Sequence, residues 1–116
     1  MESGWGINFT QQGNTIFATW FTYDFDGAPL WLVVTATNSA LGVYTGTLYR
    51  TTGPAFNADP FQSSSVSEAP VGTATLTFVN GNSASFSYTI NTTTDPIIQT
   101  KSITRQVFRS PGTVCR

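Results

Sequence analysis

Polar and apolar residues alternate with a period of two over most of the chain. Residues 73–78 (Thr-Ala-Thr-Leu-Thr-Phe) and 83–90 (Ser-Ala-Ser-Phe-Ser-Tyr-Thr-Ile) alternate without interruption. Such a period is typical of strands with one buried face, and no segment shows the spacing of a long amphipathic helix. The pattern therefore predicts an all-β protein without a long helix.

Turn residues divide this pattern into strands. Asn80-Gly81 is a strong hairpin signal, for which we expect positive φ at both residues, and a Pro- and Ser-rich stretch over 52–70 indicates a long loop with room for a short strand near Val66. The expected strands are about 4–10, 15–23, 30–37, 43–51, 73–78, 83–90 and 98–108. Seven or eight strands in this order predict a small antiparallel up-and-down meander barrel or a strongly curled sheet over residues 1–109, with a tail over 110–116.

The turns also set the register of the first three strands. A two-residue loop at Gly13-Asn14 places Ile7 opposite Trp20, and a left-handed Gly27 places Trp20 opposite Leu32. One face of the sheet then carries the expected core, which comprises Trp5, Ile7, Phe9, Ile16, Ala18, Trp20, Leu32, Val34, Tyr44, Leu48, Leu76, Phe78, Phe86, Tyr88 and Ile90.

The opposite face is mostly Thr and Ser, but large aromatic residues interrupt it at one end. These residues are expected to lie together beside Gly4 and Gly6, and they are Phe21, Tyr23, Trp31 and Tyr49. Aromatic side chains on an outward face form a candidate partner surface. The alternative is that they cover the glycine backbones or pack under the long loop.

Two arginines fall on the core side of their strands by parity, Arg50 and Arg105. An inward guanidinium is costly unless it is paired, stacked on an aromatic ring or extended to the barrel mouth. Each arginine is therefore either a closing residue of the sheet or a ligand-binding group in a cavity. If the first and last strands pair and close the barrel, Arg105 is expected beside Trp5.

Composition narrows the possible chemistry. The net charge is −1, only 9% of residues are charged, and the chain has no His and one Cys, Cys115. These values argue against a nucleic-acid partner and against imidazole-based catalysis, and we expect no metal or other cofactor. No apolar run approaches the ~20 residues of a membrane helix, so no membrane span is expected. The segment Asp24-Phe25-Asp26-Gly27 fits a hairpin turn better than a calcium loop, because the twelfth position is Thr35.

Several stretches resemble an uncharacterised domain, often repeated, of exported bacterial proteins. They are Glu2-Ser3-Gly4-Trp5-Gly6, Phe17-Ala18-Thr19-Trp20-Phe21-Thr22-Tyr23-Asp24, Trp31-Leu32-Val33-Val34 and Gly46-Thr47-Leu48-Tyr49. The resemblance implies export and a β fold, and no activity. More loosely, the chain is similar to calycins, the lipocalin and avidin type of barrel, with Gly4-Trp5 and Arg105 as counterparts of their Gly-x-Trp and closing Arg. The spacing departs from theirs, because Trp5 follows Gly4 directly.

Low charge and many Thr, Ser, Asn and Gly residues also favour an extracellular or periplasmic location, with a leader absent from this chain. Cys115 then either has a partner outside this chain or is a free thiol of the tail. We expect a non-catalytic binding module that takes a glycan, peptide or small apolar ligand at the aromatic surface or the barrel mouth. One alternative is an assembly domain that forms a homo-oligomer, or packs on a neighbouring repeat, through its aromatic face. Another is a small hydrolase that uses loop carboxylates.

Overall fold

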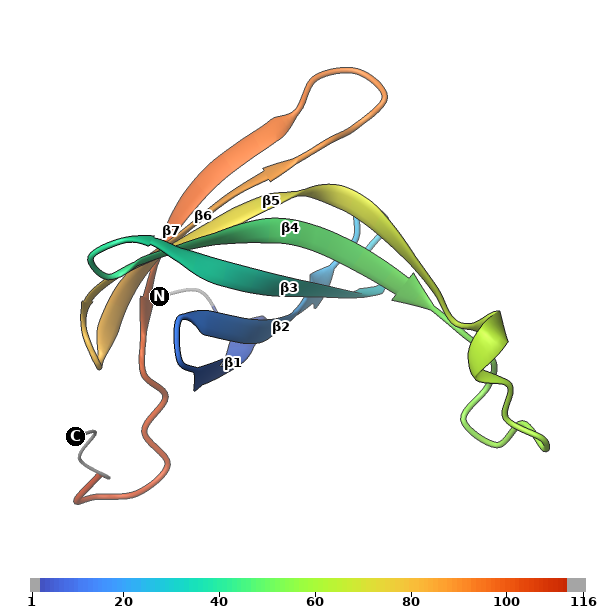
Figure 1. Ribbon diagram of the computed structural model, residues 1–116, viewed down its shortest axis with the longest axis horizontal. Helices are drawn as coiled ribbons and strands as arrows, with labels where there is room; N and C mark the ends of the chain where they lie inside the picture. Colours follow the sequence, from blue (N-terminus) through green and yellow to red (C-terminus); the bar gives the residue numbers. More distant parts are fainter. Residues whose placement is uncertain (1–2, 113–116) are drawn as a thin grey trace.

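The computed structural model describes residues 3–112, which form one antiparallel sheet whose strand order is the order of the chain (Figure 1). Its strands are β1 (Gly6–Gln12), β2 (Thr15–Tyr23), β3 (Pro29–Ala40), β4 (Val43–Thr52), β5 (Ser67–Asn80), β6 (Ser83–Ile90) and β7 (Ile97–Thr104). The one helical element of the described residues is the single 3-10 turn η1 (Ser63–Ser65). The predicted all-β meander is therefore confirmed.

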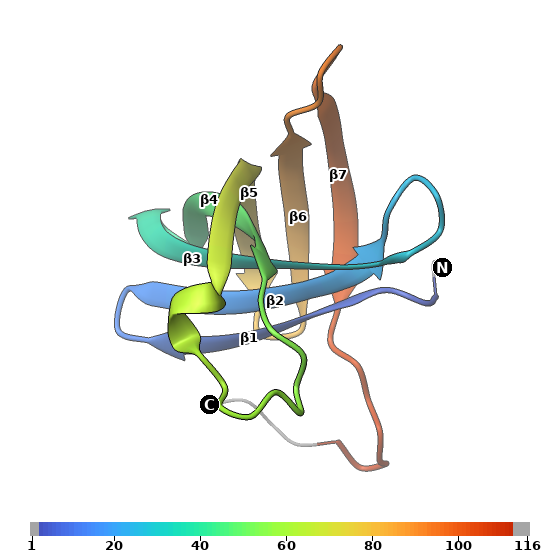
Figure 2. The same ribbon diagram turned by 90° about the vertical axis from the view of Figure 1, so that its right-hand side faces the viewer.

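The sheet is strongly curled and open. Among the described strands, β1 pairs only with β2 and β7 pairs only with β6, so of the two predicted alternatives the chain adopts the strongly curled sheet and not the closed barrel. In Figure 2, β1, β2 and β3 run roughly horizontally while β6 and β7 run roughly vertically, because the sheet folds over on itself. The concave side between these two layers contains the core.

Small residues in the middle of the concave side allow this curl. Ala36 of β3 faces Gly46 of β4, and a Cβ on Gly46 would lie 2.2 Å from the carbonyl oxygen of Thr35. A Cβ on Gly72 of β5 would lie 1.9 Å from the carbonyl oxygen of Thr89. Backbones approach this closely only where there is no side chain, so the two glycines let the central strands bend.

The predicted register and most of the predicted core are confirmed. Trp20 lies opposite both Ile7 and Leu32, and Gly27 has a φ of +83°. The fully buried apolar residues are Ile16, Ala18, Trp20, Leu32, Val34, Ala36, Leu48, Ala74, Leu76, Ala84, Phe86 and Tyr88. Phe9 is a correction, because its side chain remains 42% exposed near the edge of the sheet.

Several predicted boundaries and turns are corrected. The stretch expected to be loop to residue 70 becomes strand from Ser67, and β4 and β5 extend together as an arm that projects from the body (Figure 1). The last strand ends at Thr104, so Arg105 lies outside it. The Asn80-Gly81 hairpin forms, but neither residue has positive φ; the side chain of Asn80 instead accepts the Asn82 N–H at 2.8 Å.

Residues 105–112 follow β7 without regular secondary structure, so residues 105–108, expected to be strand, are a correction, and 110–112 belong to the expected tail. The predicted partner of Cys115 concerns a residue outside the described part of the chain. Within residues 3–112, no helix has the length and apolar character needed to cross a membrane.

Candidate functional site

The two ends of the curled sheet are filled differently, and the first end is closed by aromatic rings. Phe78 of β5 makes edge-to-face contacts with Phe9 of β1 and with Tyr44 of β4, with centroids 5.5 and 6.0 Å apart. The side-chain amide of Gln11 donates a hydrogen bond to the Tyr44 hydroxyl at 3.1 Å. These side chains connect the two layers and fill what we call the closed end.

At the other end, the aromatic rings that connect the two layers lie inside the core, and a pocket lies between them and the rim. Trp20 of β2 contacts Phe86 and Tyr88 of β6, with ring centroids 5.0 and 4.6 Å apart. The pocket has a volume of about 430 Å³. This mouth pocket is lined by Trp20, Thr22, Tyr23, Asp24, Phe25, Leu30, Leu32, Arg50, Val71, Tyr88, Ile90, Asn91, Thr92, Ile97 and Gln99.

Strand parity and one bulge place the walls of the mouth pocket. Leu32 pairs with both Trp20 and Arg50, so these three side chains share the concave side in one row across β2, β3 and β4. A register shift beside Leu48 leaves Val71 as an extra residue of β5. Bulges redirect side chains in this way, and here the bulge adds an aliphatic side chain to the wall.

Two tight loops form the rim of the mouth pocket. In the β2–β3 turn, the Asp24 N–H donates to the Ala28 carbonyl at 2.8 Å, and the Asp26 carboxylate accepts the Ala28 N–H at 3.0 Å. In the β6–β7 loop, the Thr92 hydroxyl donates to the Asp95 carbonyl at 2.5 Å. The acidic residues of the first turn therefore act as turn formers, as predicted. Residues 3–112 contain no group of three or more His, Cys, Asp or Glu able to hold a metal ion.

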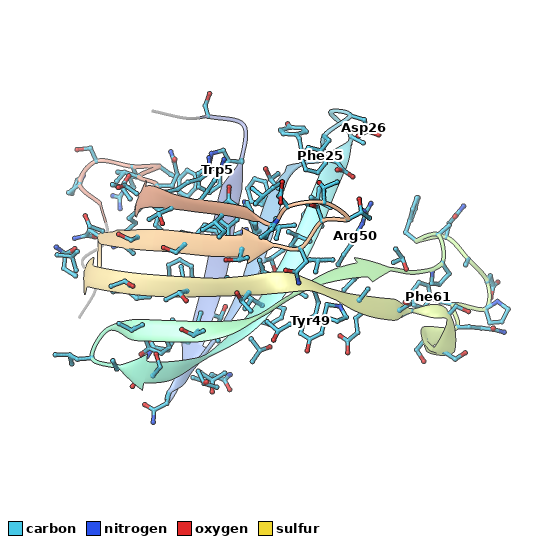
Figure 3. The ribbon with its side chains drawn as sticks, turned by 90° about the horizontal axis from the view of Figure 1, so that it is seen from above. Trp5, Phe25, Asp26, Tyr49, Arg50 and Phe61 are labelled. Carbon is cyan, nitrogen blue, oxygen red and sulfur yellow. The ribbon has the colours of Figure 1, made fainter. Side chains whose placement is uncertain are left out.

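One ion pair crosses the rim. Arg50 Nη1 lies 3.7 Å from Asp24 Oδ2, and their side chains are 51% and 30% exposed. Asp24 Oδ1 accepts the Phe25 N–H at 2.7 Å. Figure 3 shows Arg50 and Tyr49 on opposite sides of the sheet, as the alternation along β4 requires. The rim thus carries one guanidinium on the concave side beside a carboxylate held by its own turn.

Two polar groups accompany the aromatic rings of the mouth pocket. The indole N–H of Trp20 is buried and has no acceptor among the described residues. The Tyr88 hydroxyl donates to Gln99 Oε1, which leaves the Gln99 amide N–H₂ as a further donor. A buried donor without an acceptor is unusual in a folded protein. The pocket therefore combines apolar walls with a few polar groups, among which the Gln99 amide N–H₂ is a donor.

The predicted aromatic face, which we define as Phe21, Tyr23, Trp31 and Tyr49, lies on the convex side. Trp31 is 57% exposed and Tyr23 is 56% exposed, while the ring of Phe21 tilts against Trp31 with centroids 5.9 Å apart. A Cβ on Gly6 would lie 2.6 Å from the Phe21 ring, so Phe21 covers this glycine. Tyr49 is half-buried in the next row. Phe21 therefore covers backbone, as one predicted alternative states, while Trp31 faces solvent and the partner surface stays a prediction.

The two predicted arginines lie at opposite ends of the molecule. Arg50 lines the mouth pocket, whereas the Arg105 N–H donates to the Asn82 carbonyl at 3.0 Å, beside the β5–β6 hairpin. Trp5 approaches the last strand through Lys101, whose Nζ is 5.2 Å from the indole centroid. The predicted site residues therefore do not form one cluster, and side chains rather than hydrogen-bonded backbone bridge the seam between the edge strands.

The sequence interpretation missed most of the mouth pocket. The alternation predicts Trp20 and Tyr88 as core residues only, and the turn chemistry predicts Asp24 as a turn residue. The alternation along β2 puts the polar Thr22 on an otherwise apolar side, and that along β7 puts Gln99 on the inward side, which is the signal that marks this end. The chain was compared with protein-family models, with curated proteins and with solved structures, and nothing matched in any of the three comparisons.

Proposed function

We propose that the protein is a non-catalytic binding module that takes a small molecule with an apolar body into the mouth pocket. One observation carries this proposal: aromatic rings fill the closed end, whereas the opposite end of the same core opens into a pocket of about 430 Å³. Small-molecule sites have volumes of this order, apolar walls and a few placed polar groups.

The lining favours a small ligand over a glycan or an extended peptide. Leu30, Leu32, Val71, Ile90 and Ile97 supply aliphatic surface on several sides of the pocket. A sugar ring needs many polar partners, whereas these walls are largely aliphatic. The absence of His from the sequence and the use of both turn carboxylates in the turn itself support a binding role rather than catalysis. Composition and the bacterial resemblance support an exported, extracellular or periplasmic protein.

Titration with the neutral fluorescent dye N-phenyl-1-naphthylamine tests the proposal. Neighbouring isoleucines provide matched variants, because Ile97 lines the pocket while Ile98 is 70% exposed on the convex side. We expect Ile97→Gln to weaken dye binding several-fold, since a polar group in the pocket costs desolvation, and Ile98→Gln to leave it unchanged. A wild-type protein that does not bind the dye, or equal losses in the two variants, would overturn the proposal.

A second candidate function is self-assembly through the aromatic face. Trp31 and Tyr23 are more than half exposed beside the half-buried Phe21, and large exposed aromatic side chains are typical of interfaces. We expect the wild-type chain to form an oligomer in light scattering and Trp31→Ser to be a monomer with unchanged dye binding. A monomeric wild-type chain at high concentration would eliminate this candidate.

A further inference from the structure

Arg50 is the one cation that lines the mouth pocket, and its guanidinium is weakly engaged. Its ion pair with Asp24 spans 3.7 Å, which is longer than a hydrogen bond, and the residues described provide it with no hydrogen-bond acceptor. A guanidinium carries five N–H donors in a planar fork that matches a carboxylate. Most N–H groups of Arg50 are therefore available for hydrogen bonds to a ligand at the rim.

Asp24, in contrast, is fixed in place. Its Oδ1 accepts the Phe25 N–H at 2.7 Å and its own N–H donates to the Ala28 carbonyl at 2.8 Å. Of the two partners, Arg50 has the longer and more exposed side chain. A rearrangement of this pair therefore moves the guanidinium and leaves the turn intact.

The rest of the lining favours an acceptor-rich ligand. The Gln99 amide N–H₂ adds donors to those of Arg50, whereas Asp24 is the one carboxylate of the pocket. Below the rim the walls are aliphatic, and Leu32 lies directly opposite Arg50 in the register. A cation would compete with Arg50 for a carboxylate that its turn already uses, while an anion finds unfilled donors.

On the basis of the function proposed above, we propose that the mouth pocket takes amphipathic carboxylates. The carboxylate binds the Arg50 guanidinium, which leaves Asp24, and the apolar body extends down the aliphatic walls toward Trp20. Asp24 thereby acts as a competitor that holds Arg50 at the rim until an anion replaces it. Arg50 selects the ligand by charge and by its paired N–H groups.

Displacement of N-phenyl-1-naphthylamine from the full chain by decanoate and by 1-decanol tests this assignment. The two competitors share a chain length and differ in charge. We expect decanoate to displace the dye at about a tenfold lower concentration than the alcohol, because hydrogen bonds to charged groups are the stronger class. Equal displacement would overturn the carboxylate assignment and leave the proposed function standing. A wild-type chain without dye binding would overturn both.

Three variants separate Arg50 from general electrostatics. Arg50→Met should abolish the preference for decanoate, whereas Arg109→Met, which removes the same charge among residues after β7, should keep it. Asp24→Asn should strengthen decanoate binding about two- to fivefold, the range expected for loss of a competing exposed ion pair, and should leave decanol unchanged. Thermal unfolding of each variant checks that the fold is retained.

The same variants can contradict the inference. A lost preference in Arg109→Met would assign the effect to net charge rather than to Arg50. Weaker decanoate binding in Asp24→Asn would show that Asp24 positions Arg50 and does not compete with the ligand. Either result overturns the proposed exchange of partners.

Discussion

The closed end and the mouth pocket are built from the same alternating strands, yet aromatic rings fill one end and a pocket opens at the other. At the closed end, Phe9, Tyr44 and Phe78 reach across the concave side from three strands and contact one another. At the mouth, the row next to Trp20 holds Thr22 and Leu30, and β4 contributes Arg50. One end of the core becomes a pocket because the inward positions nearest the strand ends carry shorter or charged side chains in place of aromatic rings.

The largest effect is expected from removing the ring that separates the mouth pocket from the rest of the core. Trp20 is 3% exposed, so Trp20→Ala should lower the free energy of unfolding by about 3–5 kcal/mol in urea denaturation. Trp31→Ala is the matched control on the convex side and should cost less than about 1 kcal/mol in a monomer. Equal losses would refute the assignment of sides.

Opening the closed end should cost less, because its rings are partly exposed. Phe78→Ala removes both edge-to-face contacts and should cost about 2–3 kcal/mol. Phe25→Ala, at the 84% exposed tip of the rim turn, should change stability by less than about 0.5 kcal/mol. If Phe25→Ala at the rim proved as costly as Phe78→Ala at the closed end, the contrast between the ends would not hold.

A smaller effect is expected from the hydroxyl at the base of the mouth pocket. Tyr88→Phe removes the hydrogen bond to Gln99 and should cost about 1 kcal/mol in the same assay. Tyr49→Phe makes the same change on the aromatic face and should be close to neutral. A neutral Tyr88→Phe would indicate that the hydroxyl does not help to hold β6 and β7 together at the mouth.

The smallest effect concerns the seam between the edge strands. A double-mutant cycle on Trp5→Leu and Lys101→Met should give a coupling of about 0.5–1 kcal/mol, because Lys101 lies over the indole. The pair Trp31 and Lys101, on opposite sides of the sheet, serves as a control and should be additive. Additive losses for Trp5 and Lys101 would show that their contact does not stabilise the seam.

Alternation and turn chemistry were sufficient to predict the meander, the first registers and the side of nearly every core residue. These features depend on neighbours in sequence, as the pairing of Trp20 with Leu32 across the Gly27 turn illustrates. The mouth pocket was only partly predictable. Strand parity indicates that Arg50 points inward. It does not predict Asp24 as the partner of Arg50, because that contact depends on how β4 lies against the β2–β3 turn.

Features that depend on the curl of the whole sheet were not predictable from local patterns. The start of β5 contains Pro70, which favours a loop in isolation, yet in the structure Pro70 pairs with Tyr49 just beyond a register shift. Proline is tolerated in a strand near such irregularities. Closure of the barrel depends likewise on accumulated twist and bending, which bring Lys101 to Trp5 without bringing the two edge strands into register.

The identity of strand order and chain order has a consequence for how the protein folds. Every backbone pairing joins strands adjacent in sequence, so contact order is low for an all-β protein and folding should be fast for this class. The long-range contacts are those of side chains between layers, such as Phe9 with Phe78 and Trp20 with Phe86. Amide hydrogen exchange should therefore be slowest in β2–β6 and fastest in β1 and β7, from which the sheet can unzip one strand at a time.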